Sequence, residues 1–106
     1  MFNVIKNKTL NEYGEKYPEA KNALQKWYYE LKNADFKNIN ELKEVYTNVS
    51  LVADNRVIFN ICGNKYRLIV RINFTYKNVL IKWFGTHKEY DKINAEKIDF
   101  DEKITK

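Results

Sequence analysis

The run from Thr86 to Asp91 contains the residues of this chain best suited to proton transfer and phosphate binding. His87 is the only histidine, and its ordinary pKa lies near neutrality, which makes it the first candidate for a general acid or base. Lys88 can contact a phosphate, and Tyr90 can stack on an unpaired base or pack the terminal segment down. Asp91 suits a helix cap or an ion pair. A single histidine is also common as a structural or exposed residue, so its surroundings decide which role is expected.

Cations on two neighbouring predicted strands form the second group of candidates. Arg67 and Arg71 lie on one face of a strand, and the guanidinium fork of arginine binds two phosphate oxygens at once. Lys65 precedes them on the same face, and Lys82 lies on the next strand. The alternative for each of these side chains is an ordinary solvated strand face. Together they are candidates for binding a phosphodiester backbone.

The positive charge of the chain is concentrated in one block. The formal net charge is +5, and residues 56–92 contain eight basic and two acidic residues, whereas residues 1–55 contain eight of each. A localised basic field of this kind is typical of a protein that binds a polyanion.

The residue types present narrow the possible chemistry. One cysteine, Cys62, and one histidine cannot assemble the usual structural zinc site or an internal disulfide. Two carboxylates in the basic block disfavour a two-metal nuclease, and there is no glycine-rich phosphate loop. RNA cleavage without metal remains possible because the 2′-hydroxyl supplies the nucleophile. We therefore expect no metal and no cofactor.

Hydrophobic spacing predicts helices in the first half of the chain. Thr9 and Glu12 have the spacing of a capping box that opens a first helix, and Pro18 ends that helix or starts the next. Apolar residues at intervals of three and four predict an amphipathic helix from Glu19 to about Asn33. Further elements are a short strand at residues 2–5 and a short helix at residues 40–47, capped by Asn40 or Asn38.

Alternating and apolar runs predict three strands in the second half, at residues 56–61, 66–74 and 79–84. Their short connections favour an antiparallel meander, followed after Gly85 by a short helix or loop. The fold class is therefore α+β, in two layers, with a small antiparallel sheet and the N-terminal helices packed on one face. The other face is expected to be open and to carry Arg67 and Arg71. The chain is expected to form a single domain over residues 1–106, with a frayed tail from about residue 96.

Two motifs resemble the HigB toxin family and, more distantly, the RelE-like toxins. They are the run Phe59-Asn60-Ile61-Cys62-Gly63-Asn64-Lys65-Tyr66-Arg67-Leu68-Ile69 and the run Gly85-Thr86-His87-Lys88-Glu89-Tyr90-Asp91. The helices around Lys16-Tyr17-Pro18 are also similar, so the resemblance covers nearly the whole chain.

The resemblance implies the toxin of a type II toxin–antitoxin system, an endoribonuclease that cuts mRNA, typically on the ribosome. It also implies a RelE-like fold and inhibition by an antitoxin, here expected to be a HigA-like helix-turn-helix protein. Arg67 matches the arginine that contacts the scissile phosphate in such toxins. His87 matches the basic position after the last strand, and Tyr90 matches the C-terminal tyrosine.

Two other functions use the same basic face, namely a non-catalytic RNA- or ribosome-binding module and a domain that binds an acidic protein. A chain without an apolar run of about 20 residues and with a single cysteine is expected in the cytoplasm.

Overall fold

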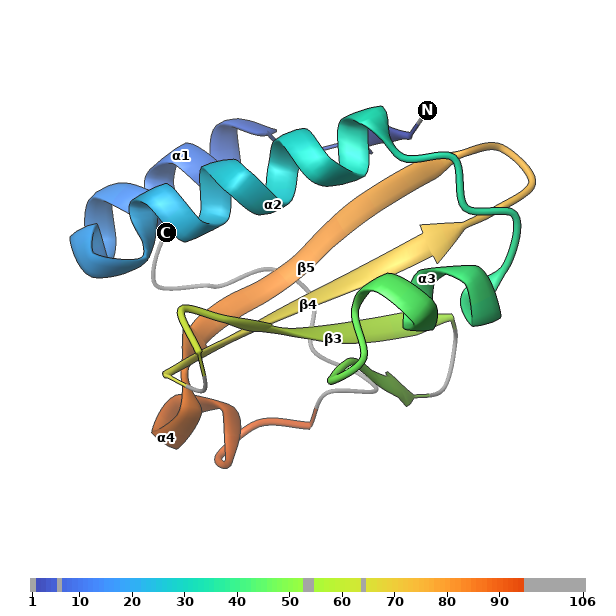
Figure 1. Cartoon of the computed structure of the whole chain (residues 1–106). Coiled ribbons are helices and arrows are strands. Elements are labelled where there is room, and N and C mark those ends of the chain that lie inside the picture. The colour runs from blue at the N-terminus through green and yellow to red at the C-terminus, as the bar shows by residue number, and fades with distance from the viewer. Residues whose placement is uncertain (1, 6, 53–54, 64, 95–106) are drawn as a thin grey trace.

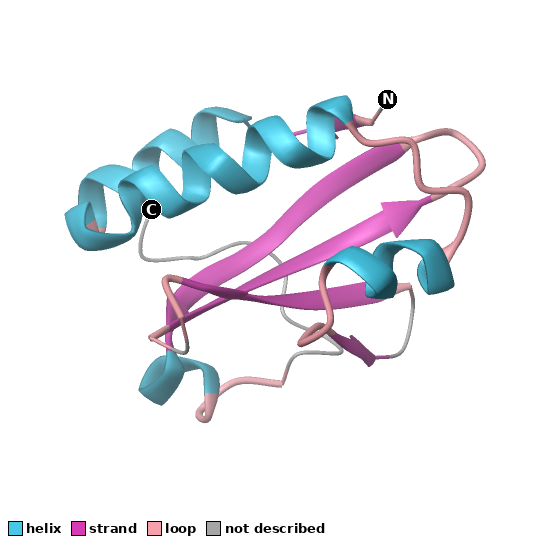
Figure 2. Ribbon diagram, viewed as in Figure 1, coloured by secondary structure: helices cyan, strands magenta, loops and turns pink. Residues whose placement is uncertain are grey.

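A computed structural model describes residues 2–5, 7–52, 55–63 and 65–94 of the protein. The chain forms a five-stranded sheet with helices on one face (Figures 1 and 2). The elements, in chain order, are β1 (Asn3–Ile5), α1 (Asn7–Lys16), η1 (Pro18–Ala20, a 3-10 helix), α2 (Lys21–Asn33), α3 (Ile39–Val45), β2 (Ser50–Val52), β3 (Arg56–Ile61), β4 (Tyr66–Asn73), β5 (Asn78–Thr86) and α4 (His87–Tyr90).

The predicted α+β class with helices on one side of a small sheet is confirmed. Strand order is β1-β5-β4-β3-β2, and β3, β4 and β5 form the expected antiparallel meander. Two short strands extend this meander. The first strand, β1, pairs with β5 in parallel, and β2 adds an antiparallel edge beside β3.

The helical boundaries follow local sequence signals. Pro18 starts η1 directly after α1 has ended, as its ring permits only in a first turn. Asn38 caps α3, since its side chain accepts a hydrogen bond from the backbone N–H of Glu41 at 3.0 Å. The predicted cap at Thr9 is wrong, because α1 already begins at Asn7 and Thr9 lies inside the helix.

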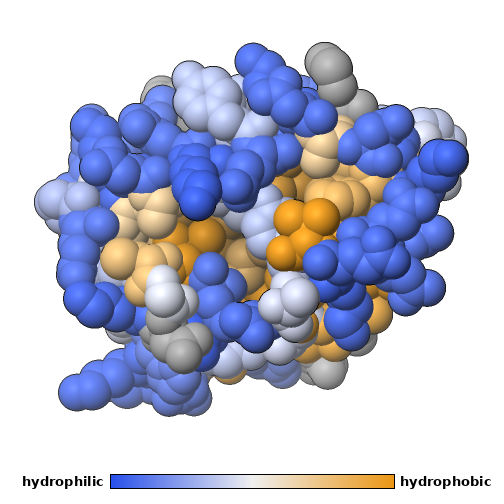
Figure 3. Space-filling view, viewed as in Figure 1, coloured by the Kyte–Doolittle hydropathy of each residue, from blue (hydrophilic) through white to orange (hydrophobic). Residues whose placement is uncertain are grey.

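The main core fills the space between the helices and the sheet. It is built by α1, α2 and α3 on one side and by alternate residues of β3, β4 and β5 on the other, and its fully buried members include Leu24, Leu31, Leu42, Leu68 and Phe84. The outer surface on the side seen in Figure 1 is mostly hydrophilic, with apolar side chains visible in patches between the polar ones (Figure 3). None of the helices in the described part of the chain is long and apolar enough to cross a membrane.

The second face of the sheet is not open, contrary to the sequence-based expectation. Ile58, Ile69 and Trp83 form a small buried cluster there, and residues that follow β5 pack over it, among them Tyr90 and Ile93. The C-terminal segment after β5 therefore covers part of the face that carries Arg67, and this packing determines the geometry of the site. The expected frayed tail from about residue 96 lies outside the described residues.

Candidate active site at the end of β4 and β5

The short helix α4 is held at the end of β5 by its own first turn. The Thr86 Oγ1 accepts a hydrogen bond from the Glu89 N–H at 3.2 Å, and Glu89 Oε1 accepts one from the Thr86 N–H at 2.9 Å. This reciprocal pair is a capping box, which satisfies backbone donors that a helix start leaves unpaired. The backbone N–H of His87 also donates to the Lys65 carbonyl at 3.0 Å, which joins α4 to the start of β4.

Glu89 also connects α4 to the N-terminal helices. Its Oε1 accepts a hydrogen bond from the Tyr17 hydroxyl at 2.7 Å, from a residue 72 positions away in the chain. Tyr17 lies just after α1 and packs edge-on against Phe84 of β5. The orientation of α4 is therefore fixed from both the sheet and the helical layer. The Thr86-x-x-Glu89 spacing could have indicated the capping box in the sequence, but not the bond to the distant Tyr17.

Arg67 and Tyr90 come together at this end of the sheet. The Cζ atom of Arg67 lies 6.0 Å from the centroid of the Tyr90 ring, within the range of a cation–π contact. The Tyr90 ring is tilted against Trp83, with the centroids 6.4 Å apart. Tyr90 thus packs α4 against Trp83 of the sheet, and its ring also contacts the Arg67 guanidinium from one side. Arg67 is half-buried and oriented by this stack.

Gly85 makes this stack possible. It lies opposite Arg67 in the β4–β5 register, and a Cβ at this position would lie 2.6 Å from Cη2 of Trp83. Such a separation is far inside van der Waals contact, so any side chain at Gly85 would displace the indole. The sequence suggested Gly85 only as a strand breaker, whereas it is the last-but-one residue of β5 and gives the Trp83 ring room over the strand.

His87 projects from the first position of α4 with its side chain 50% exposed. Its Nδ1 atom lies 3.3 Å from Asp91 Oδ2, a contact that is an ion pair only when the imidazole is protonated, and Asp91 is also the C-cap residue of α4. A carboxylate beside Nδ1 favours the tautomer that carries its proton on Nδ1 and leaves Nε2 as the acceptor. Nε2 is then the ring nitrogen available to a substrate. Lys88, the next residue, is exposed on the same helix.

Lys65 is engaged in an ion pair that the sequence did not predict. Its Nζ atom is paired with Oε1 of Glu19, which belongs to η1. The hydrogen bond from Lys65 and the positive charge of Lys65 lower the pKa of the Glu19 carboxyl. In turn, the hydrogen bond and the negative charge of Glu19 raise the pKa of Lys65. The Tyr66 hydroxyl also donates a hydrogen bond to Glu19 Oε2 at 3.4 Å. The pKa of Tyr66 is raised mainly by burial and, to a smaller extent, by the Glu19 carboxylate. Lys65 therefore reaches a phosphate only in competition with Glu19.

Arg71 and Lys82 do not join the cluster at α4. Arg71 is exposed on the same face as Arg67, but four residues further along β4, which corresponds to about 13 Å. Lys82 is only 9% exposed, so the alternative role of an ordinary solvated lysine on this strand is wrong. The reason is a register shift in β5. Ile69 pairs with Trp83 and Val70 with Ile81, which leaves Lys82 as the extra residue of a bulge.

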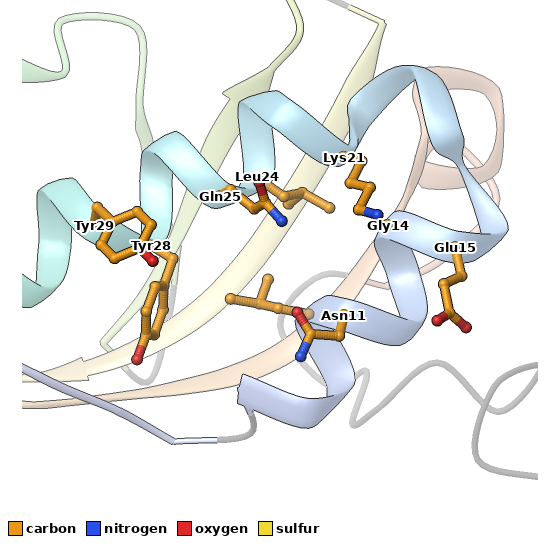
Figure 4. Close-up of a pocket in the computed structure, with 9 residues that line it drawn as sticks. Asn11, Gly14, Glu15, Lys21, Leu24, Gln25, Tyr28 and Tyr29 are labelled. Carbon is orange, nitrogen blue, oxygen red and sulfur yellow. The ribbon is translucent and has the colours of Figure 1, made fainter.

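A hollow of about 400 Å³ lies elsewhere, between α1 and α2 (Figure 4). Asn11, Glu15, Lys21 and Gln25 are among its lining residues, together with apolar atoms such as those of Leu24. None of the predicted site residues lines it, and it contains no histidine.

Within the described residues, no group of three His, Cys, Asp or Glu side chains could hold a metal ion. The cluster at α4 is therefore the candidate active site.

The small α+β fold, with helices on one face of the sheet and arginine, histidine and tyrosine at one end of its last strands, agrees with the RelE-like class of toxins to which the family comparison assigns the chain. Residues 20–93 match the family described as HigB_toxin, the RelE-like toxic component of a toxin–antitoxin system. Because this match covers more than half of the chain, the chain belongs to the HigB toxin family.

Three relatives are similar to this chain over most of its length and most of their own. The chain is 31% identical over 94 residues to the mRNA interferase toxin HigB of Escherichia coli strain K12, an alignment that covers 87% of this chain and 90% of the relative. It is 31% identical, with the same coverage, to the mRNA interferase HigB of Shigella flexneri. It is 29% identical over 92 residues to the mRNA interferase HigB of Escherichia coli O6:H1, covering 85% and 89% of the two chains.

Proposed function

We propose that this toxin is a metal-independent endoribonuclease that cuts mRNA at the cluster formed by Arg67, His87 and Tyr90. The observation that carries the proposal is the contact between the Arg67 guanidinium and the Tyr90 ring, three residues along α4 from an exposed histidine. A fixed cation beside a histidine that can act as a general acid or base is an arrangement suited to phosphodiester cleavage. The names of the relatives, which are mRNA interferases, support the same activity.

The proposed reaction is attack by the 2′-oxygen of the RNA on the adjacent phosphorus. A bond forms between O2′ and phosphorus, the bond from phosphorus to O5′ breaks, and the products are a 2′,3′-cyclic phosphate and a 5′-hydroxyl. One proton leaves the 2′-hydroxyl and one is delivered to the departing O5′. His87 transfers one of these protons through Nε2, and the Tyr90 hydroxyl is the second proton-transfer candidate in α4. Arg67 binds the non-bridging oxygens and stabilises the charge of the phosphorane.

Contacts further along the RNA come from the remaining cations. Lys88 is exposed beside His87, and Arg71 is exposed on the second face of the sheet, so both are assigned to flanking phosphates. Lys65 joins them when it exchanges Glu19 for a phosphate. Lys82 is the weakest of the predicted RNA contacts because of its burial.

The proposed partners follow from the family and from the charge. An antitoxin is expected to block the cluster at α4 or its surroundings, and a HigA-like helix-turn-helix protein is the proposed antitoxin. The ribosome is the proposed site of cleavage, and the cytoplasm, where mRNA is translated, is the proposed compartment.

The test uses purified chain and an end-labelled mRNA, with and without ribosomes. Wild-type protein should produce discrete fragments that end in a cyclic phosphate, and His87→Ala and Arg67→Ala should reduce the cleavage rate by about 10²- to 10⁴-fold. Lys26→Ala, an exposed lysine of α2 remote from α4 in the fold, serves as the control and should cleave normally. Folded wild-type protein that binds mRNA or ribosomes without producing fragments would instead identify a non-catalytic RNA-binding module.

A further inference from the structure

A second hollow, of about 340 Å³, lies beside the outer edge of β3. The edge strand β2 pairs with β3 only from Arg56 to Ile58, so the later residues of β3 extend past its end. The chain that leads from α3 into β2 forms the opposite wall. The lining residues are Val45, Tyr46, Thr47, Asn48, Val49, Phe59, Asn60 and Gly63.

The lining of this hollow suits a flat, uncharged ligand with a polar edge. Its lining includes the half-buried Tyr46, the buried Phe59 whose ring centroid lies 5.1 Å from that of Tyr46, and two asparagines, but no charged residue. The Tyr46 hydroxyl donates a hydrogen bond to Glu30 at 2.8 Å, which fixes the ring. Burial, with a further effect of Glu30, raises the pKa of Tyr46, so the phenol stays neutral. An unpaired nucleobase has these properties, whereas a phosphate or an acidic peptide would find no charge to pair with.

Asn60 supplies the polar edge. Its Nδ2 donates a long hydrogen bond of 3.4 Å to the Asn48 carbonyl, which orients the amide. One N–H is used in this way, and within the described part of the chain Oδ1 accepts no hydrogen bond. A primary amide presents a donor beside an acceptor, which is the pattern needed for a bidentate contact with the edge of a base.

The position of Asn60 connects the hollow to the candidate active site. Asn60 and Arg67 are directly opposite in the β3–β4 register, so their side chains start from the same face of the sheet. The hollow at the outer edge of β3 lies about 10 Å from β4, which is two strand spacings. Neighbouring nucleotides of one RNA strand can span this separation.

We infer that the hollow lined by Tyr46, Asn48 and Asn60 binds one unpaired base of the RNA whose scissile phosphate lies on Arg67. This inference rests on the proposed function, because it takes Arg67 as the phosphate contact. Asn60 hydrogen-bonds the edge of the base, and the half-buried ring of Tyr46, which packs against the buried Phe59, forms an apolar wall beside its face. The pocket fixes the register of the RNA relative to His87 and thereby contributes to the choice of the cleaved bond.

The experiment measures binding separately from cleavage. Short 2′-O-methyl RNAs, which cannot undergo attack by the 2′-oxygen, are labelled and titrated with the full chain by fluorescence anisotropy. One RNA has all its bases, and each of the others has a single abasic residue at a different position. Wild-type protein should bind one of the abasic RNAs roughly tenfold more weakly than the complete RNA. Asn60→Ala should lose this difference while keeping its affinity for that abasic RNA.

Two further variants keep the result interpretable. Asn60→Asp preserves the shape of the side chain but replaces the amide donor, and Tyr46→Leu removes one ring, so both should reduce the base dependence. Asn22→Ala, an exposed asparagine of α2, is the matched control and should behave as wild type. Thermal denaturation of each variant establishes that it is folded.

The outcomes separate this inference from the proposed function. Equal binding of complete and abasic RNAs by a wild-type protein that cleaves mRNA would overturn the pocket and leave the nuclease intact. A base dependence that persists in folded Asn60→Ala and Asn60→Asp would do the same. Wild-type protein that neither binds these RNAs nor cleaves mRNA would overturn both. Weaker binding of the antitoxin by Asn60→Ala, with base dependence intact, would assign the pocket to the protein partner.

Discussion

Replacing Gly85 by alanine should damage the site without touching a proposed catalytic group. An added Cβ would lie 2.6 and 2.7 Å from two carbons of the Trp83 indole and 2.9 Å from Glu89 Oε1. Carbon atoms in contact are about 3.5–4.0 Å apart, so the indole must move. Because Trp83 supports Tyr90, and Tyr90 supports the Arg67 guanidinium, the displacement should reach the cation proposed to bind phosphate.

The magnitude follows from the burial of the ring. Trp83 is only 6% exposed and packs with Ile58 and Ile69, so it has little space into which to move. Overpacking of a buried site costs about 1–3 kcal/mol, and we expect Gly85→Ala to lower the free energy of unfolding by this amount. For a domain of this size each kcal/mol corresponds to a fall in Tm of about 4–8 °C.

The same substitution at Gly14 provides a control with the opposite sign. Gly14 lies inside α1, and an added Cβ there would have as its nearest neighbour, at 3.2 Å, the Cγ of the flexible Lys21 side chain. Alanine inside a helix is about 0.5–1 kcal/mol more favourable than glycine. Gly14→Ala should therefore leave the stability unchanged or raise it, and should not alter RNA binding.

Urea denaturation followed by circular dichroism measures both effects, and anisotropy with 2′-O-methyl RNA measures the consequence for the site. The two carbons of Trp83 that an added Cβ would meet, Cη2 and Cζ2, belong to the outer, benzene part of the indole, which is absent from the smaller side chain of Trp83→Phe. The double variant should therefore lose less stability than the sum of the two single changes, with a coupling of about 0.5–3 kcal/mol. A Gly85→Ala protein whose stability lies within about 0.5 kcal/mol of wild type, or strict additivity in the cycle, would refute the assignment of Gly85 as the residue that seats the indole.

Three further substitutions test other contacts of the structure. Glu19→Gln removes the partner of Lys65, so RNA binding should tighten at low salt. In anisotropy titrations, the slope of log K against log salt should steepen by about 0.7. An unchanged slope would mean that Lys65 reaches no phosphate. Because the pKa of Glu19 is lowered, the pair should persist below the ordinary pKa of a glutamate and be lost as the pH falls through the lowered value. Tyr17→Phe removes the hydroxyl that holds Glu89, and should cost about 1 kcal/mol in urea denaturation, whereas an unshifted midpoint would count against this link. Asn38→Ala removes the cap of α3 and should also cost about 1 kcal/mol by the same assay; a loss below about 0.3 kcal/mol would contradict the capping role.

The local elements could be predicted because they depend on neighbours in the chain. The helix proposed from Glu19 to Asn33 is α2 with a 3-10 turn before it, and the three predicted strands match β3, β4 and β5 within a residue or two. Hydrophobic spacing, a proline and an asparagine cap are all local signals. Short connections between the strands allow only antiparallel pairing, so the meander of β3, β4 and β5 could be predicted as well.

Long-range packing could not be predicted in the same way. The parallel pairing of β1 with β5 joins segments more than 70 residues apart, and no spacing in the sequence indicates it. The alternation of β4 suggested an open face with Arg67 and Arg71, but whether a face is open depends on what folds back over it. The bulge at Lys82 is equally hidden, since one extra residue changes which side chains share a face.

The site itself was predicted in part. Arg67 and Tyr90, both named from the sequence as candidate site residues, lie in contact at the end of the sheet, although the sequence did not predict that contact. The ion pair of Lys65 with Glu19 was missed, since 46 residues separate the two side chains. The catalytic and RNA-binding roles remain proposals that the cleavage and binding assays test.

The position of His87 depends on tertiary contacts, not on helix propensity. A helix of four residues is far too short to be stable alone, because nucleation costs more than one or two hydrogen bonds return. What holds α4 is the capping box, the bond from the His87 N–H to Lys65, and the seating of Tyr90 on Trp83. Arg67 depends on them through Tyr90, whose ring contacts its guanidinium. A substitution that loosens any of them should therefore weaken cleavage through the arginine and the histidine together, so losses from such variants should not add to the loss from His87→Ala.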